Sequence, residues 1–300
     1  MKKIILALAL SVVVSAAAFA QSGTPFEVAP PPDGTGGGGS TGGPTGDYTQ
    51  PNLSYHGGSK LQYAKLVYIF WGFSWTGAPG SGEYTSELVG FRKAGMPNHL
   101  SMLNQYNAPQ SASQLNYGYQ ADVWDPVGPP PGDISDFQVQ QEILKYFHNQ
   151  IDPWTIYTVV LPLGTYPINP LGGRTCGGGA YGNSCAYHYK FIDHQTYGDA
   201  HGHYAVIPWP ECEGCHPPGF SDAMASEVHI IHEAREVMTD PELNAWYDSN
   251  GQEADDKCAY ARSASNVFVN YAPVGAPYYN AIWSFGFQKE WSNAVHGCVE

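Results

Sequence analysis

The chain has 300 residues and a formal net charge of −14, with 27 acidic side chains against 13 basic ones. Nucleic acids and anionic membrane surfaces need a basic binding surface, so this balance excludes both as expected partners. No stretch after residue 20 is long and apolar enough to cross a bilayer, so the sequence predicts no membrane span.

The first 20 residues have the layout of a cleavable secretory signal peptide. Lys2 and Lys3 precede an apolar stretch, and Ala18 and Ala20 stand just before Gln21. Cleavage there leaves a chain of charge −16, with 27 acidic and 11 basic residues. We therefore expect an exported protein, located outside the cell or, as the alternative, in the periplasm.

The domain organisation follows from composition. Residues 21–47 are rich in glycine and proline and offer almost nothing that a core could bury, which predicts a disordered linker. Residues 48–300 are expected to form a single domain.

Six cysteines lie in this domain, and an even number in an exported protein predicts three disulfides. Pairing between neighbours in the sequence is the simplest expectation. It joins Cys176 to Cys185, Cys212 to Cys215 and Cys258 to Cys298.

Alternating and periodic apolar residues predict the regular elements. In chain order they are a strand at 63–72, a helix at 84–106 broken at Gly95 and Pro97, a helix at 133–150, strands at 155–164, 185–192 and 203–209, and a helix at 222–240. The helix at 133–150 should begin at Ser135 or Asp136, with an apolar side formed by Phe137, Ile143, Leu144 and Phe147. The expected fold class is α+β, a mixed sheet with flanking helices in a zincin-like arrangement, followed by an irregular C-terminal part closed by a disulfide.

The helix at 222–240 carries the strongest functional pattern. It is capped by Ser221 or Asp222, and Pro241 cannot continue it. At the helical repeat, five polar side chains fall within an arc of about 100°, opposite an apolar face. They are His229, His232, Glu233, Glu236 and Asp240. No lysine lies among them, although acids clustered without a base are costly to bury unless a cation or protons compensate.

The segment His232-Glu233-x-x-Glu236 is one substitution away from the zincin pattern His-Glu-x-x-His. His232 and Glu236 would hold the metal, and Glu233 would take a proton from metal-bound water. Zinc is the favoured ion, and the carboxylate in place of a second imidazole also admits calcium or manganese. The plainer interpretation is an acidic helix face that hydrogen-bonds to neighbouring loops.

Further donors lie close in the sequence. Asp240 lies on the same helix face, and either Asp256 or Glu253 could supply a third ligand. The alternative for Asp256 and for Glu253 is a purely structural role in a tight polar turn around Asn250-Gly251.

Cys212-Glu213-Gly214-Cys215-His216 matches the c-type haem attachment motif and would make the protein a monohaem cytochrome. The remaining cysteines point to a disulfide-forming environment, so the motif favours a disulfide over haem c.

Four segments resemble the EXORDIUM, or phosphate-induced protein, family of secreted proteins, in the same order along the chain. They are YHGGSKLQYAKLVYIFWGFSW, CAYHYKF, HEAREVMTDPELNAWYDSNGQEADDKCAY and KEWSNAVHGCV. The resemblance covers most of residues 53–299 and is closest to bacterial members. It implies an extracellular or cell-wall-associated protein without an established biochemical activity. Plant members differ at Asp240 and lack the His-Glu pair.

Two functional hypotheses follow. The first is a secreted metal-dependent hydrolase, similar to a metallopeptidase, that holds an extended peptide along an edge strand at 203–209. The second is a noncatalytic secreted protein that binds a structural cation and acts through its surface, with cell-wall polymer as a partner. A catalytic site would keep an open coordination position above Glu233, whereas a structural ion would be enclosed by protein.

Overall fold

A computed structural model describes residues 50–72, 81–116, 120–128, 131–176, 184–194, 200–212, 214–259, 261–271 and 279–300. The expected signal peptide and linker lie outside these residues. Within the described part, no helix is both long and apolar enough to cross a membrane.

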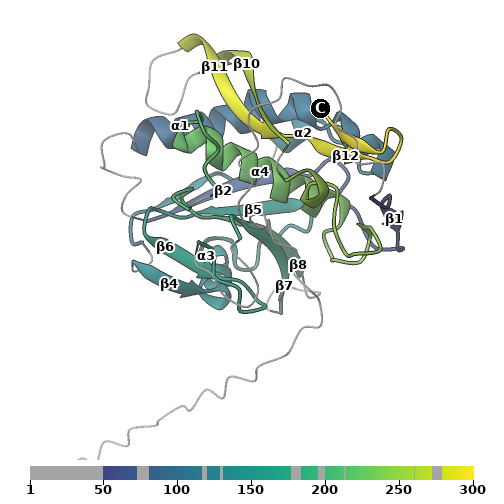
Figure 1. Cartoon of the computed structure of the whole chain (residues 1–300). Coiled ribbons are helices and arrows are strands. Elements are labelled where there is room, and N and C mark those ends of the chain that lie inside the picture. Colours follow the sequence, from purple (N-terminus) through teal and green to yellow (C-terminus); the bar gives the residue numbers. More distant parts are fainter. Residues whose placement is uncertain are drawn as a thin grey trace, which may run out of the picture.

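A five-stranded mixed sheet organises the domain, as predicted (Figure 1). Its strands, in spatial order, are β3 (Val123–Asp125), β2 (Lys65–Trp71), β5 (Thr155–Val160), β8 (Ala200–Ile207) and β7 (Tyr187–Asp193). The first four are parallel, and β7 is antiparallel to β8. The segment at 203–209 therefore does not form the predicted edge strand, because β8 hydrogen-bonds to a strand on each side.

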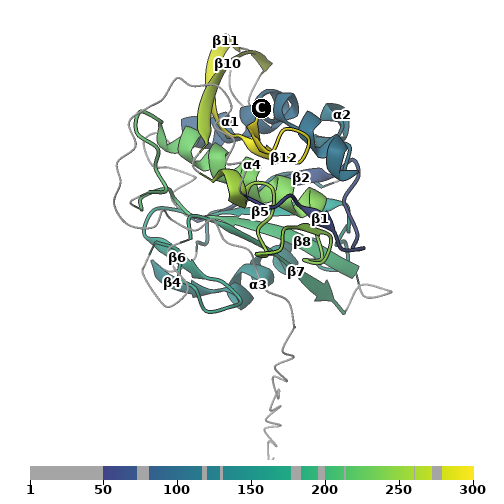
Figure 2. The same cartoon turned by 45° about the vertical axis from the view of Figure 1, so that its right-hand side comes forward.

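Helices cover both faces of the sheet. On one face lie α1 (Ser81–Gly90) and the long helix α4 (Asp222–Thr239), and on the other lies α3 (Asp136–Phe147), beside the parallel pair of β4 (Gly132–Ser135) and β6 (Thr165–Ile168) (Figures 1 and 2). Successive side chains of β2 point to opposite faces of the sheet, so the strand contributes to a hydrophobic core on each face. Leu66, Tyr68 and Phe70 pack on the α4 side. Val67, Ile69 and Trp71 pack on the α3 side.

Between α1 and β3 the chain is helical but irregular. A π-helical turn at Phe91–Gly95 and two 3-10 helices, Met96–His99 and Ser101–Tyr106, follow α1, and the short α2 spans Ala112–Leu115. The break falls at the predicted Gly95 and Pro97, where proline leaves no amide hydrogen for an α-helical bond.

The α3 helix begins with a capping box. The Ser135 hydroxyl oxygen accepts from the backbone amide of Gln138, and the side-chain oxygen of Gln138 accepts from the backbone amide of Ser135. Ile143 and Phe147 are buried as predicted. Phe137 is 66% exposed, contrary to the expectation, and Val139 takes the buried position instead. Residues Val139, Ile143 and Phe147 are spaced by four, so they share the face that meets the sheet, whereas Phe137 points away.

The C-terminal part is largely β-structure and not irregular as predicted. A hairpin pairs β10 (Arg262–Tyr271) with β11 (Tyr279–Gln288), and β12 (Glu290–Ser292) pairs with β13 (Gly297–Val299). Strand β1 (Ser54–Tyr55), near the N-terminal end of the described chain, pairs with β9 (Trp246–Tyr247). A 3-10 turn at Asp256–Cys258 follows β9 in the sequence.

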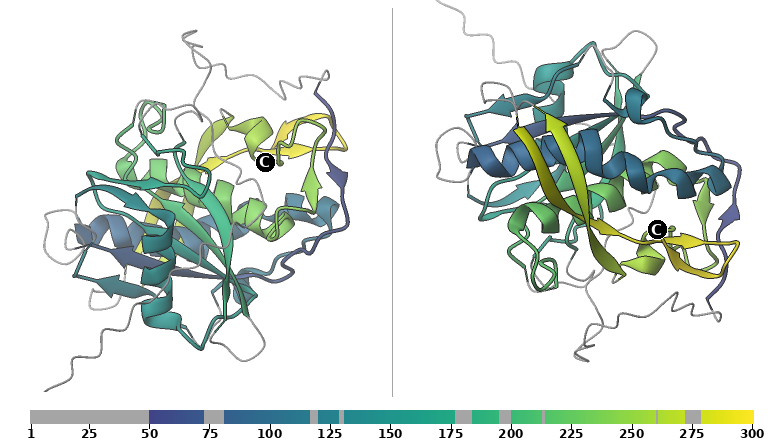
Figure 3. Two further views of the ribbon diagram at one scale, coloured as in Figure 1. Left: turned by 90° about the horizontal axis from the view of Figure 1, so that it is seen from below. Right: turned by 90° about the horizontal axis from the view of Figure 1, so that it is seen from above.

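The hairpin packs over the helical layer (Figure 3). Gly286 allows this close approach, because a Cβ atom there would lie 2.2 Å from the carbonyl oxygen of Met224 on α4. The Gly286 amide donates to Glu227 Oε2 at 2.8 Å. Helix α4 is therefore enclosed between the sheet and the hairpin, and its polar side faces protein on all sides.

Three disulfides are present, but two of the predicted pairings are wrong. Cys176 bonds to Cys212, Cys185 to Cys215, and only Cys258–Cys298 agrees with the prediction. Cys176 and Cys185 each lie beside a cysteine of the pair Cys212 and Cys215, with Cα separations of 5.1 and 5.3 Å across the two bonds. The Cys-x-x-Cys-His segment consequently has no free thiol for haem attachment.

Candidate metal centre

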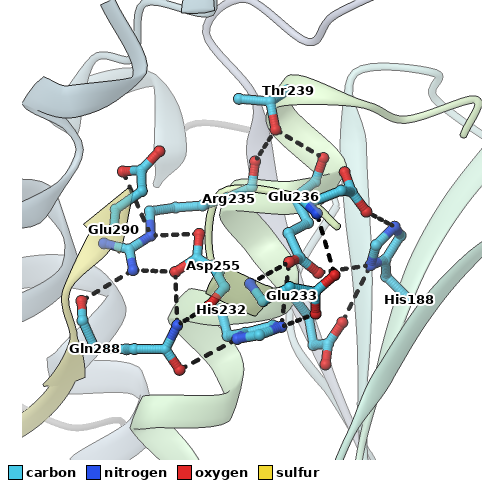
Figure 4. A network of polar contacts seen from close by, with 11 residues as sticks. His188, His232, Glu233, Arg235, Glu236, Thr239, Asp255, Gln288 and Glu290 are labelled. Atoms are coloured by element: carbon cyan, nitrogen blue, oxygen red, sulfur yellow. Dashed lines mark hydrogen bonds and ion pairs between the residues drawn. The ribbon is translucent and has the colours of Figure 1, made fainter. Parts of the chain in front are cut away.

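The polar side of α4 is the centre of a polar cluster that is buried except at Asp256, whose side chain is 9% exposed (Figure 4). Ser221 caps the helix by accepting from the Met224 amide at 3.1 Å, as predicted. The apolar face joins the core of the sheet through Ile230, Ala234 and Val237. His232, Glu233 and Glu236 are each 0% exposed. The acidic face of α4, which carries no lysine, is therefore buried and does not face solvent.

Two sets of side chains have the arrangement of metal ligands. The first donor group contains His232, Glu236 and Asp256, and the second contains His188, Glu233 and Glu236. Within each group the donor atoms lie within 4.8 Å of one another. Asp256 is thus the acid that the structure places beside the predicted ligand pair.

The first donor group has the spacing of a small ion's ligand shell. His232 Nε2 lies 3.2 Å from Glu236 Oε1 and 3.7 Å from Asp256 Oδ1. A tetrahedral zinc ion with bonds of about 2.0–2.2 Å holds neighbouring donors about 3.3–3.6 Å apart. The observed separations lie close to this range.

Gln288 determines the tautomer of His232. Its Nε2 donates to the Asp255 carbonyl at 2.7 Å, so its Oε1 is left to accept from His232 Nδ1 at 3.2 Å. A neutral His232 therefore presents the Nε2 lone pair to the two carboxylates. That nitrogen is buried and has no hydrogen-bond partner among the described residues. Metal-binding histidines typically donate their second ring nitrogen to such an acceptor.

His188 is the residue that sequence reasoning did not select. It projects from β7 toward α4, with Nδ1 at 3.1 Å from Glu233 Oε2 and 3.4 Å from Glu236 Oε2 (Figure 4). The alternation of Tyr187, Tyr189 and Phe191, which face the other core, is the signal that places His188 on the α4 side.

The remaining predicted donors lie at the margin of the two groups. Glu253 Oε2 is 3.6 Å from His188 Nε2. Asp240 belongs to neither donor group, and its Oδ1 accepts from the amides of Asn244 and Ala245 at 2.5 and 2.7 Å, which fixes the turn after α4. His229 points elsewhere and contacts the carbonyl oxygen of Cys215 at 2.8 Å, and burial lowers its pKa to about 3.

Arg235 compensates two of the neighbouring acids. Its Nε donates to Asp255 Oδ2 at 3.1 Å and lies 3.7 Å from Glu290 Oε2, and its Nη2 donates to the Gln288 carbonyl at 2.9 Å. Asp248 is similarly engaged by Lys257 at 2.7 Å. Asp248 and Asp255 are therefore paired with basic side chains, whereas Glu253 and Asp256, the other two acids of the segment 246–258, face the polar cluster.

Without a cation, the cluster holds more carboxylates than bases. Burial and the charges of Glu236 and Asp240 raise the pKa of Glu253 well above its ordinary value. Burial opposes ionisation of His188, but Glu233 and Glu236 raise the pKa of that imidazole to about 10. Several buried oxygens still have no hydrogen-bond donor among the residues described, including Glu233 Oε1, Glu236 Oε2 and both oxygens of Glu253. A cation would satisfy these atoms.

Two cavities lie elsewhere. One, of about 550 Å³, is lined by residues such as Arg92, Asp122 and Trp124, and the other, of about 410 Å³, by residues such as Trp154 and His203. Neither is lined by a member of the donor groups. His201 and His203 both contact Glu242 Oε1, at 2.9 and 3.0 Å, and belong to neither donor group.

Comparison with protein-family models, curated proteins and solved structures finds no match for this chain.

Proposed function

We propose that this protein is an exported, noncatalytic domain that binds a structural divalent cation through His232, Glu236 and Asp256. The observation that carries the proposal is the buried Nε2 of His232, which Gln288 orients toward two carboxylates and for which the described residues offer no hydrogen-bond partner. The mixture of one imidazole and two carboxylates favours zinc or manganese over calcium, which prefers a shell of six to eight oxygens.

Burial is the reason to prefer a structural ion to a catalytic one. Substrate would have to reach an open coordination position beside Glu233, yet Glu233 and the two ligands on α4 are 0% exposed. Glu233 Oε2 also contacts His188 at 3.1 Å, which engages one of the two oxygens of the proposed general base. The ion would instead join α4 to the segment that contains Asp256.

Export is part of the same proposal. Three disulfides favour an oxidising compartment, and the N-terminal sequence resembles a signal peptide. The resemblance to the EXORDIUM family suggests action at the cell surface or cell wall, with wall polymer as the partner class.

A metal-dependent hydrolase is the second candidate, because the first donor group contains three ligands. Catalytic zinc sites typically combine three protein ligands with one water molecule, and Glu233 follows His232 directly as in the zincin pattern. In this alternative Glu233 would activate the water, the arrangement would be zincin-like, and the substrate would be a peptide.

Thermal unfolding and proteolysis separate the two candidates. For a structural ion, chelation should lower the unfolding midpoint of the mature wild type by about 5–10 °C, as for a ligand present at about 100 times its Kd. The His232→Ala, Glu236→Ala double variant should show no such response. Casein cleavage that requires zinc and is lost in Glu233→Gln would replace this proposal with the hydrolase. A chelator without effect on the wild type would contradict both.

A further inference from the structure

The two carboxylate oxygens of Glu236 face different partners. Oε1 lies 3.2 Å from His232 Nε2 and accepts from the Asp256 amide at 3.2 Å. Oε2 lies 3.4 Å from His188 Nδ1 and has no hydrogen-bond partner in the part of the chain that the structure describes. We infer that the cluster binds a pair of divalent cations, one in each donor group, with Glu236 bridging them. This inference rests on the proposed cation at His232.

The second donor group has the same design as the first. His188 Nδ1 lies 3.1 and 3.4 Å from Glu233 Oε2 and Glu236 Oε2, close to the separation of about 3.3–3.6 Å between neighbouring ligands of a tetrahedral ion. His188 Nε2 points to Glu253 Oε2 at 3.6 Å. This separation exceeds a hydrogen bond, so Glu253 lies beside His188 as a neighbouring carboxylate outside the ligand shell.

Charge supports two ions over one. Arg235 places one positive charge between Asp255 and Glu290, and backbone amides cap Asp240. Four carboxylates remain around the two imidazoles, those of Glu233, Glu236, Glu253 and Asp256. With neutral imidazoles and these four carboxylates ionised, one divalent ion leaves two of their negative charges without compensation, whereas two ions balance all four, and uncompensated charge is costly in a buried site.

The chemistry of the donors defines the class of ion. Each group combines one imidazole nitrogen with carboxylate oxygens, a set that suits zinc, manganese or iron in the divalent state. Manganese is the useful probe, because two Mn²⁺ ions that share a carboxylate bridge are magnetically coupled and separate ions are not.

The test is a Mn²⁺ titration of the full-length mature protein, followed by elemental analysis and electron paramagnetic resonance. We expect two ions per chain and a coupled spectrum in the wild type. His188→Ala and His232→Ala should each retain one ion with an uncoupled spectrum. Glu253→Gln removes a carboxylate beside His188 and should weaken binding of the second ion. His201→Ala, a histidine on the neighbouring strand outside both groups, should keep both ions.

The number of bound ions distinguishes a failure of the two-ion proposal from a failure of the proposed structural cation. A single ion that is lost in His232→Ala but retained in His188→Ala would exclude the pair and leave the structural cation in place. A single ion that requires both histidines would likewise exclude the pair. The absence of bound Mn²⁺ and of any other metal from the wild type would exclude both proposals. If a variant fails to fold, the stoichiometry and spectrum of the wild type decide the matter.

Discussion

His188 Nδ1 lies 3.1 Å from Glu233 Oε2, although the two residues are 45 positions apart in the chain. The contact exists because β7 runs antiparallel at the edge of the sheet and turns His188 toward α4. It joins the predicted acidic helix face to a histidine from a different element. A helix face that looks like a single ligand pair in the sequence is therefore part of a larger cluster built from the sheet, α4, the segment 246–258 and β11.

Gln288→Leu should reduce zinc affinity by about 10- to 100-fold, because His232 would lose the acceptor that orients its ring. Competition with a chromogenic zinc chelator measures the change. Gln141→Leu, at an exposed position of α3, is the matched control and should bind zinc as the wild type does. Equal affinity in the two variants would show that Gln288 does not orient a ligand.

Arg235→Met should lower the free energy of unfolding by about 3–5 kcal/mol, because Asp255 and Glu290 would be left buried without their cation. Urea denaturation measures the loss. Arg174→Met removes an ion pair with Asp133 whose side chains are 32% and 49% exposed, and should cost at most about 1 kcal/mol. Similar losses in both variants would mean that Arg235 does not carry the buried network.

The features of the fold and the site that the sequence predicts are those specified by residues close together in the chain. The core strands, the caps at Ser135 and Ser221 and the extent of α4 follow from local patterns, which alternation and capping residues specify. His232, Glu236 and Asp256 were also within reach, because two of them share a helix face and the third follows shortly after the helix.

The missed features depend on tertiary contacts. His188 and Gln288 become relevant only when β7 and β11 pack against α4, and no local pattern specifies that packing. Disulfide pairing likewise depends on which loops meet, so Cys212 pairs with Cys176 and not with its neighbour Cys215. The β10–β11 hairpin differs from the predicted irregular C-terminal part, because its packing on α4 is a tertiary contact.

Stability should depend on pH through Glu227, which lies on α4 away from both donor groups. Burial, together with the charge of Glu87, raises its pKa well above the ordinary value of 4.5. The folded state thus favours the protonated carboxyl, whose contribution is complete below the unfolded pKa and is lost as pH rises through the folded pKa.

Accordingly, Glu227→Gln should be more stable than the wild type by about 1–3 kcal/mol at pH 8, and the difference should disappear near pH 4. Unfolding midpoints across this range measure it. Glu83→Gln, at an exposed position of α1, should change stability by less than about 0.5 kcal/mol at either pH. A difference for Glu227→Gln that does not vary with pH would contradict the assignment of buried charge.

Peptide mapping without reduction should recover the crossed pairs Cys176–Cys212 and Cys185–Cys215. Replacing both Cys185 and Cys215 by serine should cost about 3–4 kcal/mol, the loss expected for a loop of this length. Recovery of a Cys212–Cys215 peptide from the folded protein would contradict the observed packing of the two loops.

The most direct measurement is elemental mass spectrometry of the mature protein after dialysis, beside the His232→Ala, Glu236→Ala double variant. We expect at least one divalent transition metal per chain in the wild type and none in the variant, because Glu236 belongs to both donor groups. A wild type that contains no metal, or an equal content in the folded double variant, would contradict the claim that this buried cluster is a metal centre.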